Sequence, residues 1–119
     1  MIIQLTWDRP PLSLNDRGHH HPKAKAYARA VEQVRWCIRR ARVAPLTDFP
    51  IVATLHWRIP DRRRRDADNL GMTLKACLDG LVAERVIPDD DWTHVKRSSS
   101  EIHHSDGDPA MWITLEGAS

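Results

Sequence analysis

Apolar residues along the chain follow a helical spacing in two regions. Between residues 23 and 43 they recur at steps of three and four, which predicts a helix with one buried stripe. This stripe consists of Tyr27, Val31, Val34, Ile38 and Ala41. The spacing returns in Leu70, Leu74, Leu78 and Leu81, so a second helix is expected to begin near Asp68. Gly80 is expected to weaken this helix or end it early.

Four shorter segments are predicted to be strands, and the first of them is rich in β-branched and aromatic residues. They are residues 2–7 (IIQLTW), 51–59 (IVATLHWRI), 95–103 (VKRSSSEIH) and 111–116 (MWITLE). The segment HSDGDP between the last two predicts a hairpin-type loop. The resulting order, β-α-β-α-β-β, predicts one mixed sheet with two helices packed on it, in the α+β or α/β class.

Composition and charge add limits to this picture. The 119 residues fit a single domain, 1–119, and a chain this short is often completed by a partner chain. The net charge is only +2, so basic residues matter by where they lie. Cys37 and Cys77 fall in predicted helices and are expected to be reduced core thiols. With no long apolar run and no leader, we expect a cytoplasmic protein without a membrane partner.

The densest charge lies in PDRRRRDADNL, residues 60–70, where Arg62 to Arg65 are followed by Asp66 and Asp68. A second acidic group, Asp89 to Asp91, follows the second helix. Carboxylate oxygens suit Mg²⁺ or Mn²⁺, and crowded carboxylates repel unless a cation lies between them. Alone, each acidic group reads as a helix cap or a solvated turn. Together with the arginines, they favour a site that holds phosphates and hydrolyses them.

Lys75 is seven residues beyond Asp68, so both face the same side of the predicted helix. Asp79 lies four residues further and is expected to pair with Lys75. Two interpretations stay open. The pair is an ordinary surface ion pair, or the Lys75 ammonium stabilises negative charge on a cleaved phosphate.

These motifs resemble the RusA family of Holliday junction resolvases. The resemblance rests on D-R-R-R-R-D-x-D-N-L, on K-A-x-x-D-x-L and on the acidic turn before a late strand. It implies a Mg²⁺-dependent homodimeric endonuclease that nicks four-way DNA junctions in pairs, with Asp66, Asp68 and Asp90 as metal ligands and Lys75 assisting. Asp89 and Asp91 remain alternatives for the third ligand. The family's lysine stands four residues after the second aspartate, where this chain has Met72, so Lys75 is displaced by about 4.5 Å at 1.5 Å per residue.

Several basic and polar residues are expected to grip the DNA backbone. They are Arg62, Arg63, Arg64 and Arg65, with Asn15, Arg17, Lys23 and Lys25. The first helix carries further cations at Arg29, Arg35, Arg39, Arg40 and Arg42, and its basic face is expected to follow phosphates. No small-molecule substrate is expected, and a bacterial or phage-encoded protein fits the resemblance.

The position of Asp90 raises a geometric problem. A helix from Asp68 to Glu84 is about 24 Å long, whereas the six steps along the chain from Glu84 to Asp90 span at most about 20 Å. Either the helix breaks at Gly80, which we favour, or Asp90 serves the other subunit's site.

Aromatic and imidazole side chains give weaker predictions. Trp7, Trp36, Trp57 and Trp112 are expected in the core. Trp92, directly after the acids, is the exception, and stacking on a base or packing at an interface stays open for it. His103 and His104 are expected at a strand end without a catalytic role. Two other function classes stay open: a non-catalytic branched- or single-stranded-DNA binder, and a structural DNA-packaging protein.

Overall fold

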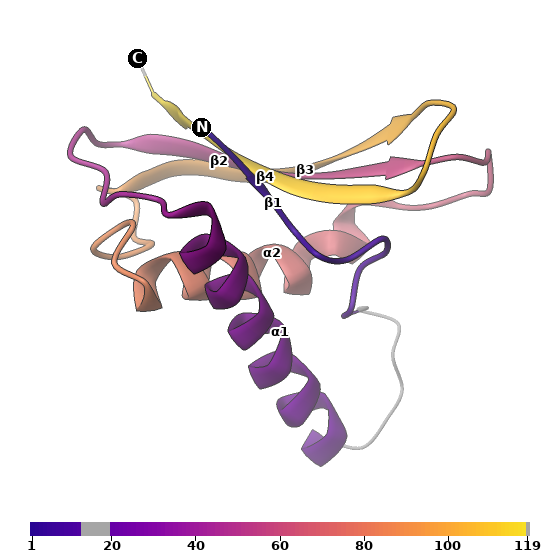
Figure 1. Cartoon of the computed structure of the whole chain (residues 1–119), viewed down its shortest axis with the longest axis horizontal. Helices are drawn as coiled ribbons and strands as arrows, with labels where there is room; N and C mark the ends of the chain where they lie inside the picture. The colour runs from indigo at the N-terminus through magenta and orange to yellow at the C-terminus, as the bar shows by residue number, and fades with distance from the viewer. Residues whose placement is uncertain (13–19, 119) are drawn as a thin grey trace.

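A computed structural model describes residues 1–12 and 20–118 as a single four-stranded sheet with two helices on one side (Figure 1). In chain order the elements are β1 (Ile2–Gln4), α1 (His20–Ala41), β2 (Ile51–Ile59), the 3-10 helix η1 (Ala67–Leu70), α2 (Gly71–Ala83), β3 (Val95–His104) and β4 (Ala110–Gly117). The sheet is mixed, with the order β1-β4-β2-β3. The predicted α+β class and the order of the main elements are therefore confirmed.

Strand β2 lies inside the sheet because both of its edges are paired. It runs parallel to β3 and antiparallel to β4. The parallel pair requires a crossover connection, which η1 and α2 supply. Since β2 separates β3 from β4, the predicted hairpin between those strands is wrong. The segment between them crosses the end of β2, and Ser105 N donates to the Ile59 carbonyl there.

Alternation of burial along β2 and β4 identifies the two faces of the sheet. Ala53, Leu55 and Ile113 are buried on the face that α1 and α2 cover. Thr54 and Thr114 alternate with them and are half-buried, on the face that carries no helix in the described chain. This uncovered side is called the outer face below.

Helix α2 runs unbroken through Gly80, so the expected early end at that residue is wrong. A Cβ atom built on Gly80 would lie 2.6 Å from Val34 Cγ1, closer than real Cβ atoms approach. The glycine is therefore explained by the close packing of α2 against α1. The helix tolerates a glycine, at a cost of about 1 kcal/mol, because tertiary packing outweighs propensity.

The buried stripe of α1 only partly follows the prediction. Val34 and Ile38 are buried as expected, and Ala30 and Cys37 join them, whereas Ala41 is exposed. Both cysteines are free and buried, which confirms their prediction as core thiols. Burial raises the pKa of Cys77 to about 12, so this thiol stays protonated.

The tryptophans separate into half-buried and exposed positions. Trp7 and Trp57 pack against the core. Trp36 is 53% exposed with Arg40 stacked on it, so its expected burial is wrong. Trp92 is 82% exposed, in keeping with its expected place outside the core. Within residues 1–12 and 20–118, no helix combines the length and the apolarity that crossing a bilayer needs.

Candidate functional site

The arginine run follows directly after the C-terminal end of β2. Arg62, Arg63 and Arg64 are exposed, and the Arg64 side chain is 91% accessible. Arg64 Nε lies 3.8 Å from Asp66 Oδ1, a loose contact at the limit of an ion pair. These guanidinium groups are therefore accessible to an anion from solution.

Arg65 differs from its three neighbours. Its guanidinium lies 2.5 Å and 3.2 Å from the two Asp61 carboxylate oxygens and stacks over the Trp57 ring at 5.1 Å. The hydrogen bonds from Arg65 lower the pKa of Asp61 to about 2. Arg65 thus holds the turn after β2 together, and binding a phosphate would require it to share or leave Asp61.

A cavity of about 560 Å³ opens beside this segment. Its charged and polar lining is Asp8, Arg9, Asp61, Arg64, Arg65, Asp66 and Asn69. Trp57, Ile59 and Leu70 add apolar surface. Residues just after β1 and residues after β2 meet here, so cationic and anionic side chains from two parts of the chain face one cavity.

The carboxylate of Asp66 is not used as a helix cap. Asp66 occupies the N-cap position of η1 with extended backbone angles (φ −104°, ψ 128°), but its side chain makes no capping hydrogen bond. Asp68 lies in the first turn of η1 and is exposed. The capping interpretation therefore fails for the Asp66 side chain, and both carboxylates are accessible for another role.

Lys75 joins the acidic turn to the exposed side of α2. Its Nζ lies 3.0 Å from Asp90 Oδ2 and 3.3 Å from Asp79 Oδ1, which confirms the predicted Lys75–Asp79 pair. The hydrogen bond with Asp90 is the largest cause that raises the pKa of Lys75. Tyr27 Oη also donates to Asp79, which links this group to α1.

Asp90 therefore returns beside the middle of an unbroken helix within its own chain. The expected break at Gly80 is not needed for this contact, because Lys75 lies about halfway back toward Asp68. Of the neighbouring acids, Asp91 is held by His94 and Thr93 at 2.5 Å and 2.8 Å. Asp89 accepts the amide of Asp90 at 2.7 Å. Asp90 is thus the member of the triplet that contacts α2.

The three candidate metal ligands do not form a compact cluster. Among the described residues, only one group of three His, Cys, Asp or Glu side chains has ligand atoms within 4.8 Å of one another, and it does not include Asp66, Asp68 or Asp90. Asp66 lies at the cavity, whereas Asp90 is engaged by Lys75. Their joint role as ligands stays a prediction.

Cationic residues of α1 fall into two classes. Lys23 and Lys25 are exposed. Arg35 and Arg39 both bind Glu84 at 2.8 Å, so they contribute to the packing of α1 near the end of α2. Asn15 and Arg17 lie outside the described residues.

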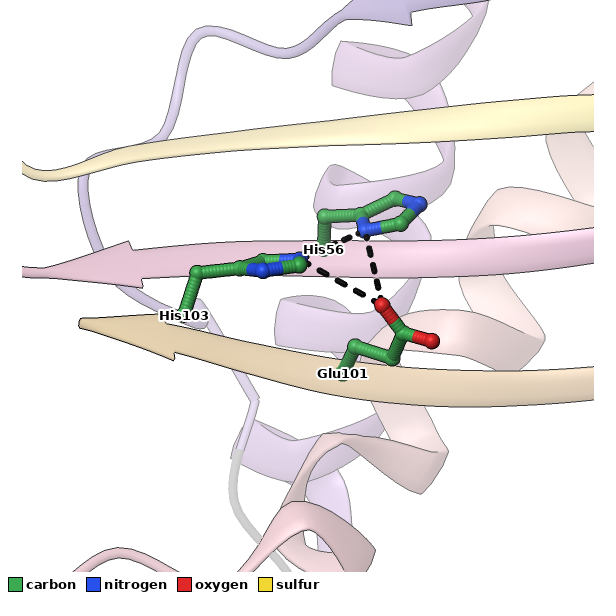
Figure 2. Close-up of side chains that lie close together, drawn as sticks. All are labelled: His56, Glu101 and His103. Atoms are coloured by element: carbon green, nitrogen blue, oxygen red, sulfur yellow. Dashed lines mark hydrogen bonds and ion pairs between the residues drawn. The ribbon is translucent and has the colours of Figure 1, made fainter. Parts of the chain in front are cut away.

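Within residues 1–12 and 20–118, the compact group of potential metal ligands is His56, Glu101 and His103, on the outer face of the sheet (Figure 2). His56 Nδ1 lies 2.8 Å from His103 Nε2, and Glu101 Oε2 lies 3.6 Å and 3.5 Å from these nitrogens. Burial, with His103 nearby, lowers the pKa of His56. A group able to bind a metal is thus present, but it consists of residues other than the predicted aspartates.

Sequence reasoning missed His56 and Glu101 for a structural reason. The E-x-H spacing in residues 101–103 places two ligands on one face of a strand, which is visible in the sequence. The third ligand depends on β2 pairing with β3 in the register that sets His56 opposite Glu101. That pairing joins residues 45 positions apart and has no local signal.

A scan of the chain against protein-family models found no match, and a search of curated proteins found none either. Any statement of function therefore depends on these residues and their geometry.

Proposed function

We propose that the chain is a Mg²⁺-dependent endonuclease that nicks four-way DNA junctions, acting as a homodimer. Mn²⁺ is the alternative ion. One observation carries the proposal. Exposed arginine side chains and the Asp66 carboxylate, which makes no capping hydrogen bond, line one open cavity beside η1. Phosphodiester hydrolysis needs this pairing, with cations to hold phosphates and carboxylates to hold a divalent ion. Two-fold symmetry suits a junction, which offers two equivalent strands to two equivalent sites.

Asp66, Asp68 and Asp90 would hold the divalent ion, which would supply a Lewis acid for phosphodiester hydrolysis. Their oxygen atoms match the ligand preference of Mg²⁺. Lys75 keeps Asp90 beside α2 at 3.0 Å, so it would position this carboxylate.

Hydrolysis would form a bond between a water oxygen and phosphorus while the bond from phosphorus to the 3′ oxygen breaks. The attacking water gives up a proton to solvent, and the leaving 3′ oxygen takes one up to become a hydroxyl. Negative charge grows on the phosphate oxygens during this step, and the Lys75 ammonium would offset it. Arg62, Arg63 and Arg64, with Lys23 and Lys25, would bind neighbouring phosphates. These five side chains are exposed, which such contacts require.

The test compares binding and nicking of a synthetic mobile four-way junction in Mg²⁺ for three proteins. They are the unaltered chain, Asp68→Asn, and Asp106→Asn as an exposed aspartate control between β3 and β4. We expect Asp68→Asn to bind normally and to lose nicking by about 1,000-fold, or about 4 kcal/mol in the barrier. Nicking by Asp68→Asn at the rate of the unaltered chain would sink the proposal.

A mixing experiment addresses the dimer. Chains carrying Asp66→Asn are combined with chains carrying Asp90→Asn, and nicking is measured after subunit exchange. Activity returns only if one site takes its carboxylates from two subunits. The Asp90–Lys75 contact within one chain favours a site without this exchange, so we expect no recovery.

A non-catalytic binder of branched or single-stranded DNA is the second candidate. The lack of a compact aspartate cluster in the described residues favours it, as does exposed Trp92, which a base can stack on. This function predicts salt-sensitive junction binding without nicking in Mg²⁺ by the unaltered chain.

A further inference from the structure

The outer face of the sheet carries a group of side chains that the proposed nuclease site does not use. His56 comes from β2, and Glu101 and His103 come from β3, the edge strand (Figure 2). His56 pairs in register with Glu101, and His103 lies two residues further along the same face. The ladder of hydrogen bonds between β2 and β3 thus sets the three ligand atoms beside one another before any ion arrives.

We propose that His56 Nδ1, Glu101 Oε2 and His103 Nε2 form a site for a divalent transition metal of the Zn²⁺ type. Imidazole nitrogens select Zn²⁺ over Mg²⁺, which takes oxygen ligands. Bonds of about 2.1 Å in tetrahedral geometry separate ligand atoms by about 3.4 Å. The two distances from Glu101 Oε2, 3.6 Å and 3.5 Å, already match this separation. The two imidazole nitrogens are 2.8 Å apart and would have to move about 0.6 Å further apart to match this separation.

Neighbouring side chains hold both imidazoles in position. The second nitrogen of His56, Nε2, lies 2.9 Å from Thr114 Oγ1, which leaves Nδ1 to face Glu101 and His103. The Trp112 ring stacks on His56 at 5.2 Å and on His103 at 5.5 Å. A partner that orients the far nitrogen of a ligating histidine is a regular feature of protein zinc sites.

Charge near the group also permits a cation. Glu101 supplies one negative charge directly. Glu116 adds a second negative charge near His56 and offsets Arg58, which lies opposite His103 and donates from its Nε to the uncharged Asp108 carbonyl at 3.1 Å. The Glu101 side chain is 58% exposed, so an ion can enter from solution on that side.

Three protein ligands leave one position for water. The proposed metal would join edge strand β3 to β2. A metal that binds the folded chain more tightly than the unfolded chain raises the unfolding temperature.

Metal binding and thermal unfolding test this proposal. Zn²⁺ and, separately, Mg²⁺ are titrated against the full chain with a competing chromophoric chelator. The measurements are repeated in a chain carrying His19→Ala, His20→Ala and His21→Ala, because consecutive histidines also bind Zn²⁺. In that background we expect one Zn²⁺ per chain and an unfolding temperature higher by on the order of 10 °C at 100-fold excess over Kd. Mg²⁺ is expected to have no such effect.

The variants His56→Ala and Glu101→Gln remove ligands, and His104→Ala is the matched control because it removes an exposed histidine from the same strand end. We expect at least 10-fold weaker Zn²⁺ binding in the first two and unchanged binding in the control. Equal Zn²⁺ affinity in His56→Ala, or no stoichiometric binding by the background chain, would overturn the proposal.

Imidazole nitrogen NMR gives a measurement that does not need variants to fold. On Zn²⁺ addition, Nδ1 of His56 and Nε2 of His103 should shift to metal-bound values, while the His104 nitrogens should not. Shifts confined to other histidines would contradict the site. Junction nicking in Mg²⁺ should persist in Glu101→Gln, so the zinc site and the nuclease proposal can fail separately.

Discussion

Two groups of arginines in this protein have the same guanidinium side chain but lie in opposite surroundings. On α1, Arg35 and Arg39 enclose Glu84, whose side chain is only 13% exposed. After β2, Arg62 to Arg64 are exposed, and the one ion pair recorded for their guanidinium groups, between Arg64 and Asp66, is 3.8 Å long. The first group has its charge neutralised within the fold, whereas the second retains charge that a ligand can neutralise. Arginine density along a sequence therefore does not distinguish a folding role from a binding role.

The largest expected effect comes from removing the exposed group. Replacing Arg62, Arg63 and Arg64 together by Gln should weaken junction binding by on the order of 100-fold at about 0.1 M salt, because binding to phosphates dominates affinity. The slope of log affinity against log salt should fall by about 0.9 for each phosphate that is no longer neutralised. The free energy of unfolding should change by less than about 0.5 kcal/mol, as is usual for exposed positions.

Fluorescence anisotropy with a labelled junction gives the affinity, and denaturant unfolding gives the stability. The matched control replaces Lys96 and Arg97, exposed cations on β3, by Gln. A similar loss of affinity in this control would mean that net charge, and not the arginine run, drives binding.

Substitution of Glu84 tests the group of arginines whose charge is neutralised within the fold. Glu84→Gln should lower the free energy of unfolding by about 1–3 kcal/mol, because Arg39 loses its carboxylate partner and Arg35 keeps only the exposed Glu32. Glu32→Gln is the control, since Glu32 is 64% exposed and makes a single contact with Arg35. Its effect should stay below about 1 kcal/mol. Equal effects of the two substitutions would show that the Glu84 contacts are ordinary surface pairs.

The contacts of Glu84 with Arg35 and Arg39 also predict how the free energy of unfolding depends on pH. Hydrogen bonds from Arg39 and Arg35 lower the pKa of Glu84 from 4.5 to about 2. A carboxyl group whose pKa is lower in the folded state stabilises the fold fully when the pH is above its pKa in the unfolded state. This stabilisation is lost as the pH falls through its pKa in the folded state. The stability difference between the unaltered chain and Glu84→Gln should therefore be constant above about pH 4.5 and shrink toward pH 2. Urea unfolding between pH 2 and 7 measures it, and a difference independent of pH would contradict the assignment.

The smallest effect concerns the helix packing that brings Glu84 to α1. Gly80→Ala should destabilise the chain by about 1 kcal/mol, because overpacking against Val34 exceeds the gain in helix propensity. In a Val34→Ala background, where the Cγ1 at 2.6 Å is absent and only the Cβ at 3.0 Å remains, the same substitution should cost less. Thermal unfolding of the four proteins gives the coupling. Additive effects would place the two residues out of contact.

Local patterns predicted the elements well where the signal repeats within one segment. The bounds 51–59 for β2 were predicted as observed, and the first helix was placed within three residues at each end. The spacing from Lys75 to Asp79 also predicted their ion pair. The sheet order was not predictable, because each strand has two edges and similar composition, and the choice of partner depends on the whole chain.

The amino-acid sequence by itself determined the helices, the strands, the buried cysteines and the adjacency of arginines to Asp66 and Asp68. These follow from periodicity and from residues close together along the chain. Tertiary structure alone decided which arginines are neutralised, why Gly80 lies within α2, and that His56 meets Glu101 and His103. Each of these depends on contacts between residues far apart in the sequence, whose energies arise only once the sheet and the two helices have packed.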